Sequence, residues 1–104
     1  MLCLTDLDPR WLSSGPSRRG MGVSFRCPHC TTRLAVWFEN PLDGGPSIDR
    51  MTHRGPLWKR SGDSFDTITL TPSIDARERD PDTREVTVVH WRGFISNGVM
   101  LVLQ

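Results

Sequence analysis

Two cysteines separated by two residues form the part of this sequence that is best suited to chemistry. They belong to the segment Cys27-Pro28-His29-Cys30. A two-residue spacer lets both thiolates point into one tetrahedral site, which is the geometry of a zinc-binding turn. A structural zinc takes four protein ligands, so the pair predicts half of a site for one zinc ion per chain.

The same pair has two other interpretations. A CxxC motif can be a thioredoxin-like redox pair, although that motif opens a helix within a βαβ unit. The residues around Cys27 and Cys30 instead show the alternation that is typical of strands. The third interpretation is a pair of reduced thiols with no shared function.

His90 is the best candidate for a third ligand. Strict alternation would place Val88 and His90 on one face of a strand, from which the imidazole can point at the thiolates of a neighbouring hairpin. A lone strand histidine can equally be a hydrogen-bonded core residue. The fourth ligand is open, and the further candidates are His29, His53 and Cys3. His53 lies in a segment rich in glycine and proline, and Cys3 ranks below it.

A water molecule as the fourth ligand would change the function. Zinc lowers the pKa of bound water to about 7, so an open site would permit hydrolysis with Asp75 or Asp66 as the base. The sequence has no HxE or HExxH motif beside the cysteines, which favours a metal without a catalytic role. A zinc-dependent hydrolase therefore stays as an alternative.

Strand-type segments must position these ligands. Residues 23–27 alternate in polarity and residues 34–38 are apolar and aromatic, so we expect the cysteines to lie in the turn of a β-hairpin. The apolar segments 86–95 and 99–103 flank Asn97-Gly98. Asn-Gly between such segments predicts a second hairpin with a type I′ turn.

A mainly β fold follows, namely a small single-domain protein of hairpins and a sheet, zinc-ribbon-like, with long loops. The domain is expected to span 1–104, with a flexible N-terminal segment at 1–20 and long loops at 40–56 and 75–85. Another strand is expected over 65–71 and a helical turn over 8–12. The predicted core consists of Phe25, Trp37, Leu70, Trp91 and Phe94.

Composition narrows the classes of partner. The chain has 104 residues, with 13 Lys and Arg against 12 Asp and Glu, for a net charge of +1. Nucleic-acid binding therefore has weak support, although Trp58-Lys59-Arg60 could stack on a base. The sequence has no apolar run of the roughly 18–20 residues that span a bilayer and no signal peptide, so we expect a cytoplasmic protein that does not bind membranes.

Several motifs in a fixed order resemble a known family. They are the CPHC segment, NPLDGGP at 40–46, LWKRSGDSFDT at 57–67, LTPSI at 70–74 and HWRGFISNG at 90–98. Together they resemble small phage and prophage proteins of unknown function that often carry the product name ammonia monooxygenase. Ammonia monooxygenase is a membrane-embedded copper enzyme, and this sequence lacks both a spanning helix and a histidine-rich copper site. The sequence therefore does not support that enzyme name.

The resemblance implies that Cys27, Cys30 and His90 form one metal site. Relatives often have another cysteine shortly before the late histidine, whereas residues 86–89 here are Val, Thr, Val and Val. This departure leaves the fourth ligand open.

The function expected from the resemblance is that of a non-enzymatic phage accessory protein in the host cytoplasm, with a host-takeover or anti-defence role. It would bind a host or phage macromolecule, with a protein as the favoured partner and a homodimer as a further option. The binding residues would lie on the loops at 40–55 and 77–84, because such residues concentrate on loops held by a rigid scaffold. A nucleic-acid-binding zinc module is a second alternative.

Overall fold

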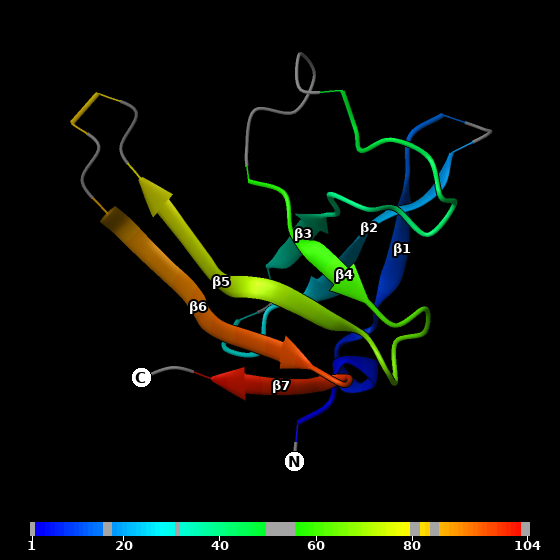
Figure 1. Ribbon diagram of the computed structural model, residues 1–104. Helices are drawn as coiled ribbons and strands as arrows, with labels where there is room; N and C mark the ends of the chain where they lie inside the picture. The colour runs from blue at the N-terminus through cyan, green and yellow to red at the C-terminus, as the bar shows by residue number, and fades with distance from the viewer. Residues whose placement is uncertain are drawn as a thin grey trace.

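The computed structural model describes residues 2–15, 18–30, 32–49, 56–79, 82–83 and 86–102, of which 72, 75–79, 86–90 and 102 are described by their backbone alone. These residues form a mainly β structure with two antiparallel sheets (Figure 1). Its elements are η1 (Leu4–Leu7), β1 (Arg10–Ser13), β2 (Arg19–Arg26), β3 (Arg33–Trp37), β4 (Lys59–Ser61), β5 (Thr69–Arg79), β6 (Val86–Ser96) and β7 (Val99–Val102). The described residues include no helix with the length and apolar character needed to cross a bilayer.

The first sheet has the order β1-β2-β3 and carries the cysteine turn. β2 and β3 pair from Gly22–Trp37 to Arg26–Arg33, so the CPHC segment lies directly beyond the last pair. The predicted hairpin around the cysteines is confirmed, because β2 and β3 pair antiparallel on the two sides of this Pro-containing turn.

The second sheet has the order β4-β5-β6-β7, and a tight turn joins its last two strands. Asn97 and Gly98 both have positive φ angles, 48° and 76°, which confirms the predicted type I′ hairpin. A Cβ on Gly98 would also lie 2.4 Å from the carbonyl oxygen of Asp66. The turn therefore needs glycine both for its backbone angle and for its close approach to the loop before β5.

The prediction of a loop over 75–85 is wrong for residues 75–79, which belong to β5, whereas residues 82–83 form a turn. β5 continues to Arg79 and β6 begins at Val86. The polar residues of β5 are held in the strand because Arg77 and Glu78 pair with Val89 and Val88 of β6. A β-branched partner strand has therefore overridden the low strand propensity of the charged segment. In contrast, residues 41–49 of the other predicted loop contain turns and bends.

Two short links join the sheets at opposite edges. Phe38 forms an isolated parallel bridge with Trp58, just before β4, and the Asn40 side chain donates to and accepts from the Arg60 backbone at 2.8 Å each. On the other side, Cys3 forms an antiparallel bridge with Val99 of β7. The two sheets thus curve around one core as a partly closed structure, with the long β5–β6 pair reaching away at one end (Figure 1).

The N-terminal residues belong to the packed domain. Leu4 and Leu7 of η1 are 0% and 5% exposed, which does not fit the flexible segment expected over 1–20. The helical turn expected over 8–12 is also misplaced, because the single 3-10 turn comes earlier and β1 takes its position. Burial of these two leucines, which no local periodicity signals, explains both differences.

The core lies between the sheets. Phe25 of β2 meets Trp91 of β6 edge to face, with ring centroids 6.0 Å apart, and Leu70 of β5 is 1% exposed. These three predicted core residues are confirmed. Trp37 is half-buried. Phe94 is 38% exposed, so the assignment of Phe94 to the core is wrong.

Alternation along β6 explains the exposure of Phe94. Trp91, Gly93 and Ile95 are buried, which leaves Phe94 on the outer face opposite Leu101 of β7, itself 49% exposed. A Cβ on Gly93 would lie 2.1 Å from the Leu101 carbonyl oxygen and 2.8 Å from the Trp91 ring. Glycine at this position lets the tryptophan ring lie along its own strand.

Replacement of Phe25 by Leu should therefore cost far more stability than the same change at Phe94. We expect Phe25→Leu to lower the free energy of unfolding by about 1–3 kcal/mol, because it removes the contact with Trp91 and leaves a void. Phe94→Leu should change it by at most about 0.5 kcal/mol. Urea unfolding measures both, and equal losses would contradict the placement of the core.

Candidate metal centre

The two cysteines lie in a turn that the backbone closes tightly. The Cys27 N–H donates to the carbonyl oxygen of Thr32 at 2.8 Å, one step beyond the last strand pair, Arg26 and Arg33. The turn is thus the end of the β2–β3 hairpin, and the strands fix where it begins and ends.

The two sulfur atoms occupy different environments. Val23 and Phe25 of β2 lie in the core, and Cys27, the residue after the strand ends, continues their spacing and is only 2% exposed. Cys30, three residues later, is exposed. A metal ion held by both would sit at the rim of the core, with one sulfur on the buried side and one on the solvent side.

Backbone N–H groups of the turn point at the buried sulfur. The His29 N–H donates to Cys27 Sγ at 3.4 Å, and the Cys30 backbone N–H also acts on this sulfur. Burial raises the pKa of the Cys27 thiol, the Cys30 side chain raises it further, and the two N–H donors oppose that rise. The donors favour the thiolate form, which is the form that binds metal.

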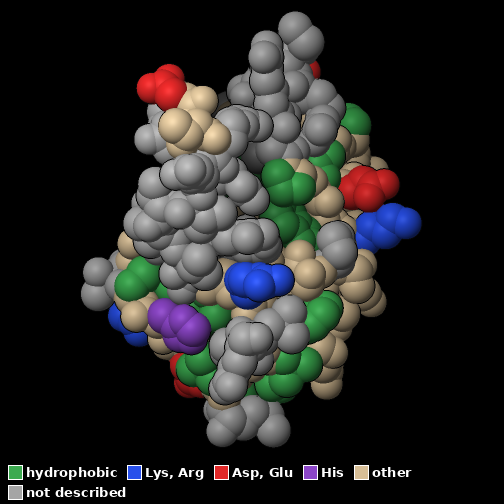
Figure 2. All heavy atoms as spheres, turned by 90° about the vertical axis from the view of Figure 1, so that its left-hand side faces the viewer, with side chains coloured by type: hydrophobic (Ala, Val, Ile, Leu, Met, Phe, Trp, Pro, Cys, Tyr) green, Lys and Arg blue, Asp and Glu red, His purple; other side chains and the backbone are tan. Residues whose placement is uncertain are grey.

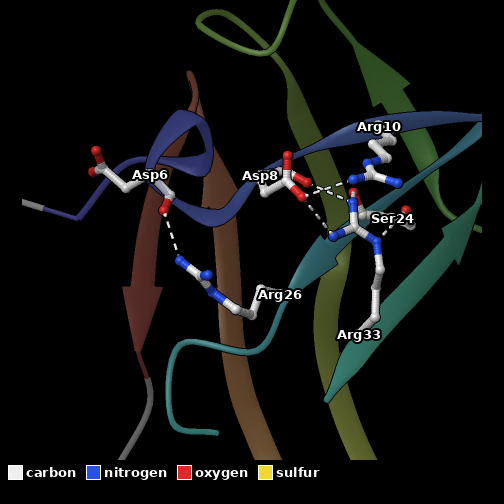
Figure 3. A network of polar contacts seen from close by, with 6 residues as sticks. All are labelled: Asp6, Asp8, Arg10, Ser24, Arg26 and Arg33. Atoms are coloured by element: carbon white, nitrogen blue, oxygen red, sulfur yellow. Dashed lines mark hydrogen bonds and ion pairs between the residues drawn. The ribbon is translucent and has the colours of Figure 1, made fainter. Parts of the chain in front are cut away.

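Polar side chains hold this hairpin at the end that carries the cysteine turn (Figure 3). The Arg33 guanidinium donates to Ser24 Oγ on β2 at 3.1 Å and to both the carboxylate and the carbonyl oxygen of Asp8. Asp8 also pairs with Arg10 at 3.2 Å. One arginine at the start of β3 thereby joins β2, β3 and the residue that precedes β1.

A second set of contacts attaches η1 next to the turn (Figure 3). Arg26, the last residue of β2, donates to the Asp6 carbonyl oxygen at 3.4 Å. The Asp6 carboxylate in turn accepts the Cys3 backbone N–H at 2.9 Å. The residue immediately before Cys27 is thus linked to the N-terminal segment.

The backbone places His90 on a strand that faces the cysteine hairpin across the core. His90 adjoins Trp91, whose ring contacts Phe25, and Phe25 lies two positions before Cys27 on the same face. The pairing with β5 passes from Ala76–Trp91 to Arg77–Val89, so His90 is the extra residue of a β-bulge. The predicted sharing of one face by Val88 and His90 concerns side chains outside the described part of the chain.

The other predicted ligands do not form a cluster within the described side chains. His53 lies outside the described residues, as does the Asp75 side chain, while Asp66 is exposed in the loop before β5. Cys3 is half-buried at its bridge to β7. Among the side chains that are described, no three His, Cys, Asp or Glu residues lie close enough together to hold a metal ion. Cys27 and Cys30 are therefore the described part of the candidate site.

Sequence reasoning missed the residues that support this turn. Arg33 and Asp8 are 25 positions apart, and Asp8 has a positive φ of 49°, which is uncommon for a residue other than glycine. The polar Asp8-Pro9 pair signals a bend, but nothing local indicates that its partner is an arginine beyond the cysteines.

No protein-family model matches the chain, and comparison with curated proteins and with solved structures found no match. A functional assignment therefore depends on the residues of this chain and their arrangement.

In metal-free protein, Cys30 should react with iodoacetamide faster than Cys27. Cys30 is exposed, whereas Cys27 is buried and burial raises the pKa of its thiol, so we expect a difference of about ten-fold or more at pH 7. Peptide mass spectrometry after timed alkylation measures both rates in one sample. Equal rates would show that the turn opens more readily than its contacts indicate.

Arg33→Gln should destabilise the hairpin more than Arg26→Gln. Arg33 contacts both Ser24 and Asp8, whereas Arg26 makes one long hydrogen bond with a backbone carbonyl. Since the Arg33 network is partly exposed to solvent, we expect a loss of about 1 kcal/mol for Arg33→Gln and about half of that or less for Arg26→Gln. Thermal melting of the two variants, which have the same charge, provides the comparison.

Proposed function

We propose that this protein is a zinc-binding β domain in which Cys27, Cys30 and His90 hold one structural zinc ion and His53 is the first candidate for the fourth ligand. The observation that supports this most directly is the pair of backbone N–H groups directed at the Cys27 sulfur from within its own turn. Hydrogen bonds to a ligating sulfur belong to the outer shell that orients and tunes metal ligands.

The chemistry of the donors favours zinc. Two thiolates with imidazole nitrogen make a soft sulfur and nitrogen site, which suits a tetrahedral zinc ion. The β2–β3 hairpin supplies the thiolates without a helix at the turn, which is the context that distinguishes this motif from a thioredoxin-like pair. A bound zinc would join the cysteine hairpin of the first sheet to β6 of the second.

Such a link suits a domain of this size. The sheets pack through a small core in which Phe25 and Trp91 are the largest aromatic contact between β2 and β6. Small domains commonly add a metal because their cores bury little surface, and binding free energy of a structural zinc becomes folding free energy. The metal in this proposal stabilises the scaffold and performs no chemistry.

The function that such a scaffold supports is binding of a macromolecule, with a protein as the partner. Figure 2 shows one face on which the described Lys and Arg side chains are interspersed with hydrophobic and acidic ones. A mixed surface suits a protein partner, whereas nucleic acids favour a continuous basic stripe. From the resemblance of its motifs we further propose an accessory role in phage-infected cells.

Zinc content and stability test the metal site directly. We expect one zinc per chain in protein purified without added metal or chelator, by atomic emission spectroscopy. Cys27→Ser, Cys30→Ser and His90→Ala should each lose the metal and unfold at lower temperature, because each removes a ligand from the link between the sheets. Full zinc content in His90→Ala would exclude His90 from the site.

Matched controls separate loss of a ligand from loss of any cysteine or histidine. Cys3→Ser and His29→Ala alter the same residue types, one near β7 and one exposed within the turn, and should keep the zinc. X-ray absorption of the wild type counts the sulfur and nitrogen atoms bound to the zinc. A water molecule as the fourth zinc ligand would support the alternative function, a zinc-dependent hydrolase. A metal-free wild type with normally folded variants would overturn the proposal.

A further inference from the structure

A cavity of about 480 Å³ lies on the side of the first sheet where β1 ends and β2 begins. The loop that follows β3 passes across these strand ends (Figure 1) and forms one wall. Three lining residues are apolar, Trp11, Leu12 and Leu42, and two are charged, Arg19 and Asp43. A volume of this size is typical of sites that bind small molecules.

Trp11 provides a rigid aromatic wall. Its ring stacks on Phe65 from the loop before β5, with centroids 4.3 Å apart and planes at 24°, and meets Phe38 edge to face at 6.4 Å. These contacts hold the ring in place while the residue stays partly exposed and lines the cavity. A fixed indole surface is therefore available to a flat ligand.

Close packing at Gly20 shapes the opposite wall. The Leu42 N–H donates to the Gly20 carbonyl oxygen at 2.9 Å, and a Cβ on Gly20 would lie only 2.5 Å from the Leu42 Cβ. Gly20 has a φ of 66°, and the pairing of β1 with β2 passes from Leu12–Gly22 to Ser13–Arg19, so a bulge occurs here. Bulges re-aim side chains, and this one separates the two strand ends that border the cavity.

The charges around the cavity leave one cation available. Asp43 pairs with Arg18 at 2.7 Å and accepts the Gly45 N–H at 2.9 Å, contacts that lower the pKa of its carboxyl group. Arg18 also donates to the Pro46 carbonyl oxygen. Arg19 is exposed and takes part in no ion pair with the residues that the structure describes. The carboxylate is thus neutralised by Arg18, and Arg19 gives the cavity a net positive character.

We propose that this cavity binds a small ligand made of a flat aromatic ring with one negatively charged group. The ring would lie against Trp11 and the side chains of Leu12 and Leu42, and the charged group would meet Arg19. The aromatic ring would stack with an offset on the Trp11 indole. The negatively charged group would accept a charge-assisted hydrogen bond from the Arg19 guanidinium. Nucleoside monophosphates and aromatic carboxylates share this chemistry, and they are the two sources to distinguish.

NMR titration of the full chain labelled with ¹⁵N tests the proposal. The probes are adenosine monophosphate and indole-3-acetate, with adenosine, indole-3-acetamide and inorganic phosphate as controls, each to about 10 mM, a range that detects weak binding. We expect saturable shifts of the Trp11 indole N–H, assigned with Trp11→Phe, and of the Gly20 amide with one or both anionic ring compounds. The compound that binds more tightly shows whether the natural ligand is a nucleoside monophosphate or an aromatic carboxylate.

Arg19→Gln should weaken binding of that compound by about ten-fold or more and leave binding of its uncharged counterpart unchanged. Lys59→Gln removes one positive charge from an exposed position outside the cavity and should leave binding unaltered. Equal binding of neutral and anionic rings, equal binding of phosphate alone, or no shift at Trp11 with either probe would each overturn the proposal. These outcomes do not depend on the zinc site.

Discussion

The contact between Phe25 and Trp91 is the interaction on which the arrangement of the rest of the chain depends. It is the point where β2 of the first sheet meets β6 of the second, and both rings are almost fully buried. The Trp91 indole N–H has no hydrogen-bond partner within the described residues. An unpaired buried donor costs about 1–3 kcal/mol, so the apolar area of the ring must outweigh that cost.

Two of the candidate metal ligands adjoin this contact in the chain. Cys27 follows Phe25 on the same face, and His90 immediately precedes Trp91. The polar network of Arg33 lies beside the cysteine turn and holds β2, β3 and the segment before β1 together. Packing thus determines how far the strands lie apart, and hydrogen bonds determine the orientation of the turn. The cysteine turn is consequently presented by a part of the fold that is fixed from two sides.

Local sequence signals predicted the features that depend on neighbouring residues. The Asn97-Gly98 hairpin and the strands around the cysteines follow from backbone preferences and alternation, which act over a few positions. Long-range packing decided the rest. The charged residues of β5 form a strand because β6 pairs with them, and Phe94 is exposed because alternation from Trp91 directs it outward.

The candidate sites also divide into features that neighbouring residues predict and features that depend on long-range packing. Spacing alone was enough to select Cys27 and Cys30 as candidate ligands, since both lie in one turn. The cavity beside Trp11 could not be found in this way, because its walls come from β1, β2 and a loop more than twenty residues further on. The pairing of Arg18 with Asp43, which leaves Arg19 available, likewise joins residues 25 positions apart. Nothing in the local composition indicates which of two adjacent arginines finds a partner.

The bridge between Cys3 and Val99 has a consequence for how the chain acquires its structure during synthesis. Residues near the N-terminus are translated first, yet their strand partner is among the last described residues to be made. Leu4 and Leu7 belong to a core to which Met100 of β7 also contributes, so that core is complete only once β7 has been made. Contacts of such high sequence separation form slowly, because loop-closure entropy must be overcome before they contribute. The segment around Cys3 then lies along part of the β7 edge, and a strand edge with a neighbour is less open to aggregation.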